Sequence, residues 1–132
     1  MLLHLNELAG KPLTTRELAL IQSFTGGHAR LIRLVFELWR TQRPDEEEPI
    51  ADLAAQSDVR DECQRILRGL HDEEQAVVLR IAQGIQKAED QPVIDHLVRR
   101  GLLREGEELR WFSPLFAEFL RSRMATATEP QG

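Results

Sequence analysis

Apolar residues recur with helical spacing along most of the chain. The stretch Thr14-Thr15-Arg16-Glu17 has the form of a capping box, so the pattern predicts a helix from there to about Phe24. The double glycine Gly26-Gly27 ends this helix, and a second one is expected from about His28 to Gln42. Only a narrow stripe of the second helix is charged, so we expect its apolar faces to pack between other elements.

An acidic run interrupts the helical pattern in residues 44–56. Asp45 and the three glutamates that follow it lie between Pro44 and Pro49, a composition typical of a solvated linker. A short helix is expected from Ile50 to Gln56, before the longer helices resume.

Two longer helices are predicted next, with Ser57 or Asp58 capping the first and Asp72 capping the second. The apolar residues that helical spacing turns inward in this pair are Val59, Cys63, Ile66, Leu67, Leu70, Val78, Ile81, Ala82 and Ile85. Pro92 suits the first turn of a further helix, which we expect to end at Gly101.

The spacing changes from helical to strand-like at Leu102. Residues 102–105 and 109–112, with a turn at Gly106, predict a short β-hairpin. Ser113-Pro114 then provides the N-cap and the first-turn proline of a last helix. Residues 125–132 have little to bury, and a disordered tail is expected there.

Helix, helix, hairpin and helix in this order is the outline of a winged helix-turn-helix. The sequence therefore predicts a mainly α fold with a partial helical lid (residues 1–43), an acidic Pro-flanked linker (44–56) and a winged-helix domain with a short β-hairpin wing (57–124). One short helix cannot cover the apolar faces of its neighbour at 28–42. We expect this pair to pack on the winged helix, on a second copy in a homodimer, or on an absent protein core.

The amino-acid composition excludes several classes of function and site. The chain has 132 residues and a formal net charge of −5, which argues against general polyanion binding while leaving room for local basic patches. One cysteine, Cys63, excludes a disulfide framework and a cysteine-rich zinc site. No stretch predicts a membrane span or a secretory signal, so a cytoplasmic location is expected.

Residues that carry catalytic chemistry are sparse. Gly10-Lys11-Pro12 is not a P-loop, because the first glycine of that motif is missing and proline stands where a hydroxyl is required. The four histidines lack the spacing of metal ligands, and no serine or cysteine has a nucleophile's context. We therefore expect neither an enzyme nor a metal or cofactor within this chain.

Basic residues gather near the predicted hairpin and the helix before it. The candidate contacts for nucleic acid or for a protein partner are His96, Arg99, Arg100, Arg104 and Arg110. Asp90 and Asp95, near the start of the helix that would enter a major groove, carry the wrong charge for facing phosphates. A winged-helix DNA-binding domain of a transcription regulator is therefore the alternative function.

The stretch Phe24-Thr25-Gly26-Gly27-His28-Ala29-Arg30-Leu31-Ile32-Arg33 resembles the lid motif of AAA-like STAND-type ATPases. Four further stretches resemble the winged helix that follows this lid in bacterial members, and they cover residues 59–63, 70–79, 97–103 and 112–120. The likeness spans residues 14–123. Ala29 departs from the family pattern, which prefers proline there.

The resemblance implies a C-terminal lid and winged-helix portion of a larger ATPase, whose P-loop lies upstream. ATP or ADP is then the parent's cofactor, with His28 and Arg30 facing the nucleotide and Arg30 meeting its phosphates. The implied function is a non-catalytic regulatory and interaction module, which couples nucleotide state to neighbouring domains. From the residues alone, Gly26-Gly27 fits a simple turn equally well, with His28 and Arg30 at a solvated helix start.

Overall fold

The computed structural model describes residues 1–10 and 12–128, with side chains described as far as Arg123. The fold is mainly helical and includes one small two-stranded antiparallel sheet. In chain order the elements are α1 (Leu2–Leu8), α2 (Thr15–Thr25), α3 (Ala29–Thr41), α4 (Pro49–Ala54), α5 (Ser57–Arg68), α6 (Asp72–Ala82), the 3-10 helix η1 (Ala88–Asp90), α7 (Gln91–Arg99), β1 (Leu103–Arg104), β2 (Arg110–Trp111) and α8 (Pro114–Thr128).

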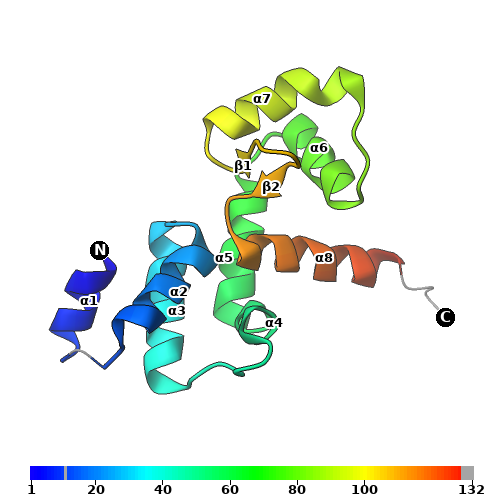
Figure 1. Ribbon diagram of the computed structural model, residues 1–132. Coiled ribbons are helices and arrows are strands. Elements are labelled where there is room, and N and C mark those ends of the chain that lie inside the picture. The colour runs from blue at the N-terminus through cyan, green and yellow to red at the C-terminus, as the bar shows by residue number, and fades with distance from the viewer. Residues whose placement is uncertain (11, 129–132) are drawn as a thin grey trace.

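Helix α8 begins beside α5 and runs outward from the middle of the molecule (Figure 1). Helices α2, α3 and α4 lie on one side of it, and α6, α7 and the hairpin lie on the other. Helix α5 links the two sides and packs against both α3 and α8. One continuous core therefore joins the two parts of the chain.

The first two predicted helices are confirmed to within a few residues. The Thr14 hydroxyl accepts a hydrogen bond from the Glu17 backbone N–H (3.1 Å), and the Glu17 carboxylate accepts one from the Thr14 N–H (3.0 Å). Gly26 ends α2 in the left-handed conformation, and His28 is the N-cap of α3. Capping and glycine signals thus fix both ends of α2.

The apolar faces of α3 are covered within the same chain. Leu31 and Val35 are fully buried, and Trp39 is 6 % exposed. Helix α3 packs against α2 and α5, and α2 packs against α8. The described part of the chain therefore covers this pair with α5 and α8, at about 1.5–3 kcal/mol for each buried side chain.

The segment expected as a linker is partly built into the core. Helix α4 packs along α8, and its Leu53 is only 2 % exposed. Residues 45–48, which precede this helix, are exposed as expected. The acidic run is therefore a surface loop, while the rest of residues 44–56 joins the two parts of the fold instead of separating them.

Several boundaries differ from the sequence-based expectations. The N-cap of α5 is Gln56, one residue before Ser57, and the N-cap of α6 is His71, one residue before Asp72. Ile85, expected to face inward, is 42 % exposed, because α6 ends at Ala82 and Gly84 then turns the chain. Helix α1 was not predicted, and its exposed leucines explain why its pattern gave no clear signal.

The predicted hairpin is confirmed, with Leu103 opposite Trp111 and Arg104 opposite Arg110. Ser113 caps α8 as expected, since its hydroxyl accepts hydrogen bonds from the Leu115 and Phe116 N–H groups. Helix α8 continues to Thr128, and the remainder of the expected tail lies outside the described residues. No helix within the described residues is long and apolar enough to span a bilayer.

Candidate functional site

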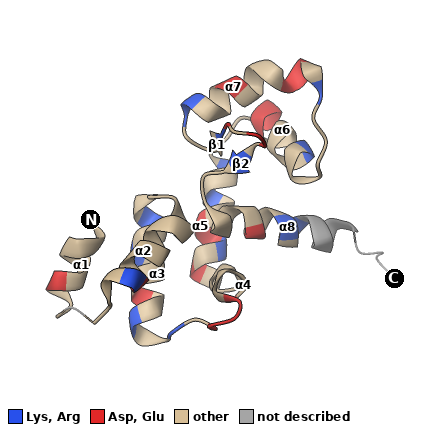
Figure 2. Ribbon diagram, in the orientation of Figure 1, with Lys and Arg blue, Asp and Glu red and all other residues tan. Residues whose placement is uncertain are grey.

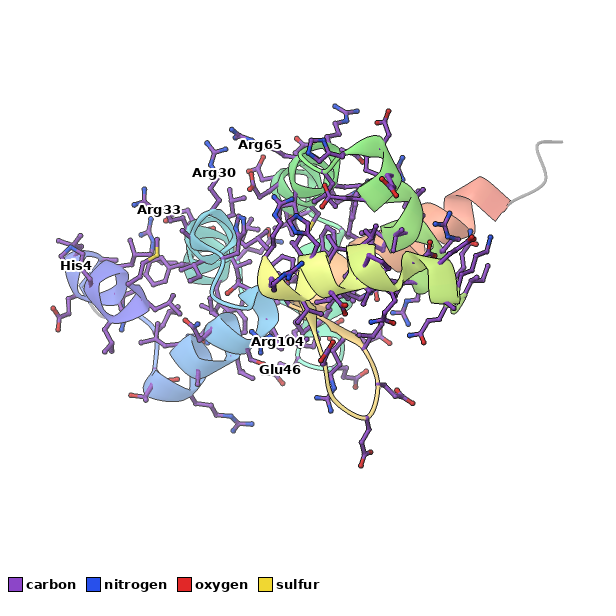
Figure 3. The ribbon with its side chains drawn as sticks, turned by 90° about the horizontal axis from the view of Figure 1, so that it is seen from above. His4, Arg30, Arg33, Glu46, Arg65 and Arg104 are labelled. Carbon is purple, nitrogen blue, oxygen red and sulfur yellow. The ribbon has the colours of Figure 1, made fainter. Side chains whose placement is uncertain are left out.

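A groove of about 590 Å³ runs between α3 and α5, and we call it the α3–α5 groove. The charged residues that line it are Arg30, Arg33, Asp58, Asp61, Glu62 and Arg65. Figure 3 shows that the three arginines project from the same edge of the molecule, two from α3 and one from α5. Guanidinium groups in such an arrangement suit an anion with several oxygen atoms.

Glu62 is the buried carboxylate of this groove, at 8 % exposed. Its two oxygens lie 3.8 Å from His28 Nε2 and 3.7 Å from a terminal nitrogen of Arg30. A buried carboxylate requires compensating partners, and both partners here come from the first turn of α3 and its cap. The two distances exceed those of a good hydrogen bond, so Glu62 holds Arg30 loosely.

His28 uses both ring nitrogens within the protein. Its Nδ1 accepts a hydrogen bond from the Leu31 N–H at 3.3 Å, which caps α3. In the neutral ring the proton is then on Nε2, the nitrogen that faces Glu62. The ring also lies against Phe112, with centroids 6.1 Å apart. The two residues expected to face nucleotide thus lie side by side and both face α5.

The glycine turn before His28 fits closely against the end of the hairpin. Gly26 has φ +64°, and a Cβ at this position would lie 2.0 Å from the Phe112 carbonyl oxygen. Two residues earlier, the Phe24 carbonyl accepts a hydrogen bond from the Ser113 hydroxyl at 2.6 Å. Glycine is therefore needed here for its left-handed backbone and also for the close approach of a second chain segment.

Two of the candidate contacts for nucleic acid or a protein partner, His96 and Arg100, lie beside another buried carboxylate. His96 Nε2 and an Arg100 terminal nitrogen lie 3.6 and 3.5 Å from Glu74, which is 6 % exposed. The His71 backbone N–H donates to Glu74, and this bond, with the charge of Arg100, lowers the pKa of the carboxyl despite its burial. Glu74 is buried although it stands in the first turn of α6, because its side chain folds back over the helix start.

The remaining three candidates, on α7 and the hairpin, are exposed. Arg104 and Arg110 are cross-strand neighbours, as predicted, and Arg99 lies near the end of α7. Within the described part of the chain these three arginines have no ion-pair partner. Like charges directly opposite each other destabilise a hairpin, so the pair favours an external anion.

Asp90 does not carry the exposed negative charge that its sequence position suggested. Arg80 donates two hydrogen bonds to its carboxylate, at 2.8 and 2.7 Å, and the residue is 5 % exposed. These bonds lower the pKa of Asp90 and keep it ionised against its burial. The start of α7 is thus less repulsive toward an anion than the residue types indicated, although Asp95 remains exposed.

Cys63 is fully buried beside the same network. Burial, together with the neighbouring charge of Glu62, raises the pKa of its thiol to about 12. A thiol with this pKa stays protonated at neutral pH and is a poor nucleophile. Among the residues that the structure describes, no group of three histidine, cysteine or acidic side chains forms a metal-binding cluster.

Sequence reasoning missed Glu62 and Arg65, which complete the α3–α5 groove. Helical spacing places Glu62 beside Val59 at the edge of the apolar stripe of α5, and Arg65 lies further round the helix. Charged residues are ordinary at such positions, so no local signal marked either residue. Their role appears only when α3 and α5 come together. Comparisons with protein-family models, with curated proteins and with solved structures found no match to this chain.

Proposed function

We propose that the chain is a non-catalytic regulatory and interaction module, built as a helical lid packed on a winged helix, of a signal-transducing ATPase. The observation that carries this proposal is the shared pairing of His28 and Arg30 with the buried Glu62. A phosphate group of bound nucleotide would compete with Glu62 for Arg30. The nucleotide-bound and nucleotide-free states would then differ in whether Arg30 of α3 pairs with Glu62 of α5.

The proposed signal passes through contacts next to this pairing. His28 lies against Phe112, and Gly26 lies against the carbonyl of the same residue. A change at the start of α3 therefore reaches the junction between the hairpin and α8 without any long chain of intermediates. The partners in this scheme are the ATPase core and neighbouring protein domains, and the location is cytoplasmic.

Titration with ADP and Mg²⁺ tests the nucleotide role, with backbone amide NMR signals as the measurement. We expect weak binding in the millimolar range, because the phosphate-binding loop belongs to another domain. Glu62→Gln removes the internal competitor while keeping the side chain's shape, so it should tighten binding severalfold. Arg30→Gln should weaken it, while Arg99→Gln serves as a matched control and should change nothing.

Glu62→Gln and Arg30→Gln should change the affinity for ADP in opposite directions. This difference distinguishes competition between Glu62 and phosphate from simple attraction between charges. If Glu62→Gln fails to tighten ADP binding, or if Arg99→Gln weakens it as much as Arg30→Gln does, the competition scheme is wrong. A P-loop of the form G-x-x-x-x-G-K-[ST] in a coding sequence upstream of this chain would independently support an ATPase parent.

DNA binding by the winged helix remains the second candidate, favoured by Arg104 and Arg110 on the hairpin, which have no ion-pair partner among the described residues. A DNA reader should lose affinity steeply with salt, because each neutralised phosphate releases counterions. Sub-micromolar duplex binding near physiological salt, weakened by Arg99→Ala or Arg104→Ala, would favour this function over the first.

A further inference from the structure

A second groove, of about 660 Å³, lies between the start of α4 and α8, and we call it the α4–α8 groove. Trp111 of β2 and Ala82 at the end of α6 also line it. It shares no lining residue with the α3–α5 groove. Its volume falls within the range of about 300–1,000 Å³ that is typical of ligand sites.

The floor of this groove is apolar. The apolar residues that line it are Pro49, Ile50, Ala51, Ala82, Trp111, Pro114 and Ala117. Trp111 is half-buried, and its ring packs edge-on against Phe116 with centroids 5.5 Å apart. The contact holds the indole in place and leaves part of it accessible from the groove.

The rim of the groove is acidic. Glu47, Glu48 and Glu118 line it, against one arginine, Arg121, which pairs with Glu118. Glu47 and Glu48 have no cationic partner among the described side chains. Figure 2 shows the acidic loop leading directly into α4, and Figure 3 places Glu46 away from the edge that carries Arg30, Arg33 and Arg65.

The acidic loop is held by its own hydrogen bonds. The Asp45 backbone N–H donates to the Asp52 carboxylate at 2.9 Å, and the Glu47 N–H donates to Asp45 at 2.8 Å. The backbone that carries the free carboxylates is therefore ordered before any partner arrives. Such preorganisation lowers the entropy lost on binding.

We propose that the α4–α8 groove binds a basic, amphipathic peptide segment of a partner protein. Apolar side chains of the segment lie against Ile50 and Ala117, and an arginine or lysine extends over Trp111 toward Glu47 and Glu48. Tryptophan is the best aromatic partner for such a cation, and the carboxylates at the rim complete the charge complementarity. This site is separate from the nucleotide-responsive one and does not depend on it.

The test uses the whole chain and a synthetic amphipathic peptide of about 15 residues, made of leucine, alanine and arginine with leucine at helical spacing. The measured signals are the indole N–H resonances of the two tryptophans, with Trp111→Phe identifying the one that belongs to Trp111. We expect the Trp111 signal to shift on titration. The Trp39 signal should stay in place, because its N–H donates to the buried Glu17.

Matched variants distinguish peptide binding in the groove from general attraction of a basic peptide to an acidic protein. Glu47→Gln with Glu48→Gln should weaken peptide binding at least tenfold, while Glu107→Gln with Glu108→Gln, at the exposed hairpin tip, should leave it unchanged. Ala117→Gln narrows the groove without adding charge and should also weaken binding. If circular dichroism shows that Ala117→Gln does not fold, the comparison of the two double glutamate variants still tests whether the peptide binds in the groove.

Three results would overturn the proposal. The first is equal weakening by the two glutamate pairs, which indicates non-specific attraction. The second is equal binding of a control peptide with glutamate in place of arginine. The third is a Trp111 signal that shifts with protein concentration alone, which assigns the groove to a second copy of the chain.

Discussion

The Ser113 hydroxyl donates a hydrogen bond to the Phe24 carbonyl oxygen across 89 positions of the sequence. The Ser113 hydroxyl oxygen in turn accepts hydrogen bonds from the Leu115 and Phe116 N–H groups, so one side chain caps α8 and fixes the end of α2 against it. Ser113 is fully buried, and a substitution there leaves a buried carbonyl without its partner.

Ser113→Ala should lower the free energy of unfolding by about 2–4 kcal/mol, since it removes an N-cap and leaves Phe24 unsatisfied. Thr14→Ala is the matched control, because it removes a purely local cap and should lower stability by about 0.5–2 kcal/mol. Urea denaturation measures both. Equal losses would show that the link to Phe24 contributes nothing beyond capping.

Gly26→Ala should be more damaging than Gly101→Ala, although both glycines have positive φ. Gly101 has open space around its missing Cβ, so alanine there adds only backbone strain, about 1–2 kcal/mol. At Gly26 the new methyl group meets the Phe112 carbonyl as well, and the total loss should exceed about 2 kcal/mol. Thermal unfolding of the two variants gives the comparison, and similar melting temperatures would contradict the close approach.

Trp39 should emit as a buried indole in the Trp111→Phe variant, with no change on dilution, because its burial lies within one chain. Trp39→Phe removes the 2.8 Å hydrogen bond to Glu17 and should lower stability by about 1–3 kcal/mol. Red-shifted emission that moves to shorter wavelength at high protein concentration would instead assign the burial to a dimer.

Stability should fall as the pH drops below about 4.5. At Glu17, burial opposes ionisation, but bonds from Thr14 and Trp39 and the charge of Arg43 hold the pKa below its ordinary value. The pKa values of Glu74 and Asp90 are also lowered. Each group therefore contributes stability above its unfolded pKa and loses it as the pH falls through its folded pKa.

The Asp90→Asn variant tests this linkage. It should be less stable than the parent at neutral pH and should lose less stability between about pH 5 and about pH 3. Glu107→Gln, at an exposed position, should leave the parent's pH profile unchanged. Melting temperatures measured across this pH range distinguish the two variants. If the melting temperatures of the parent and both variants fall in parallel with pH, the Arg80–Asp90 pair has no role in the pH dependence.

Cys63 should resist alkylation by iodoacetamide at pH 8 in the folded protein, because its raised pKa and its burial keep the thiol protonated and covered. In denaturing urea it should react at the rate of a free cysteine. Mass spectrometry follows the modification, and rapid labelling of the folded chain would contradict the packing of α5.

Local signals in the sequence predicted most helices correctly. The capping roles of Thr14, Gly26 and Ser113 act within a few residues of their own positions, so they can be recognised without the fold. The contacts that Gly26 makes with Phe112 and Ser113 makes with Phe24 become visible only in the folded chain. The caps of α5 and α6 were displaced by one residue because Gln56 and His71 are unusual at this position, while serine and aspartate nearby are common there. Helix α1 is short, and four of its seven residues are exposed, namely Leu3, His4, Glu7 and Leu8.

The candidate site was only half predictable. His28 and Arg30 attracted attention through their position after a glycine turn, but Glu62 gave no such signal. Its partners are brought to it by the packing of α3 on α5, which depends on many side chains together. The burial of Glu74 and Asp90 gave no signal in the sequence for the same reason, since burial of a carboxylate depends on an arginine that the sequence alone does not pair with it.

The packing of α2 and α3 against α5 and α8 also has a consequence during synthesis. Ribosomes add roughly 5–20 residues per second, so on the order of 4–16 s separate the addition of Trp39 from that of Leu120. Over this interval the faces of the nascent helices that later meet α8 have nothing to cover them. Newly made chains should therefore bind a ribosome-associated chaperone through residues 18–39, and release from it should follow completion of α8.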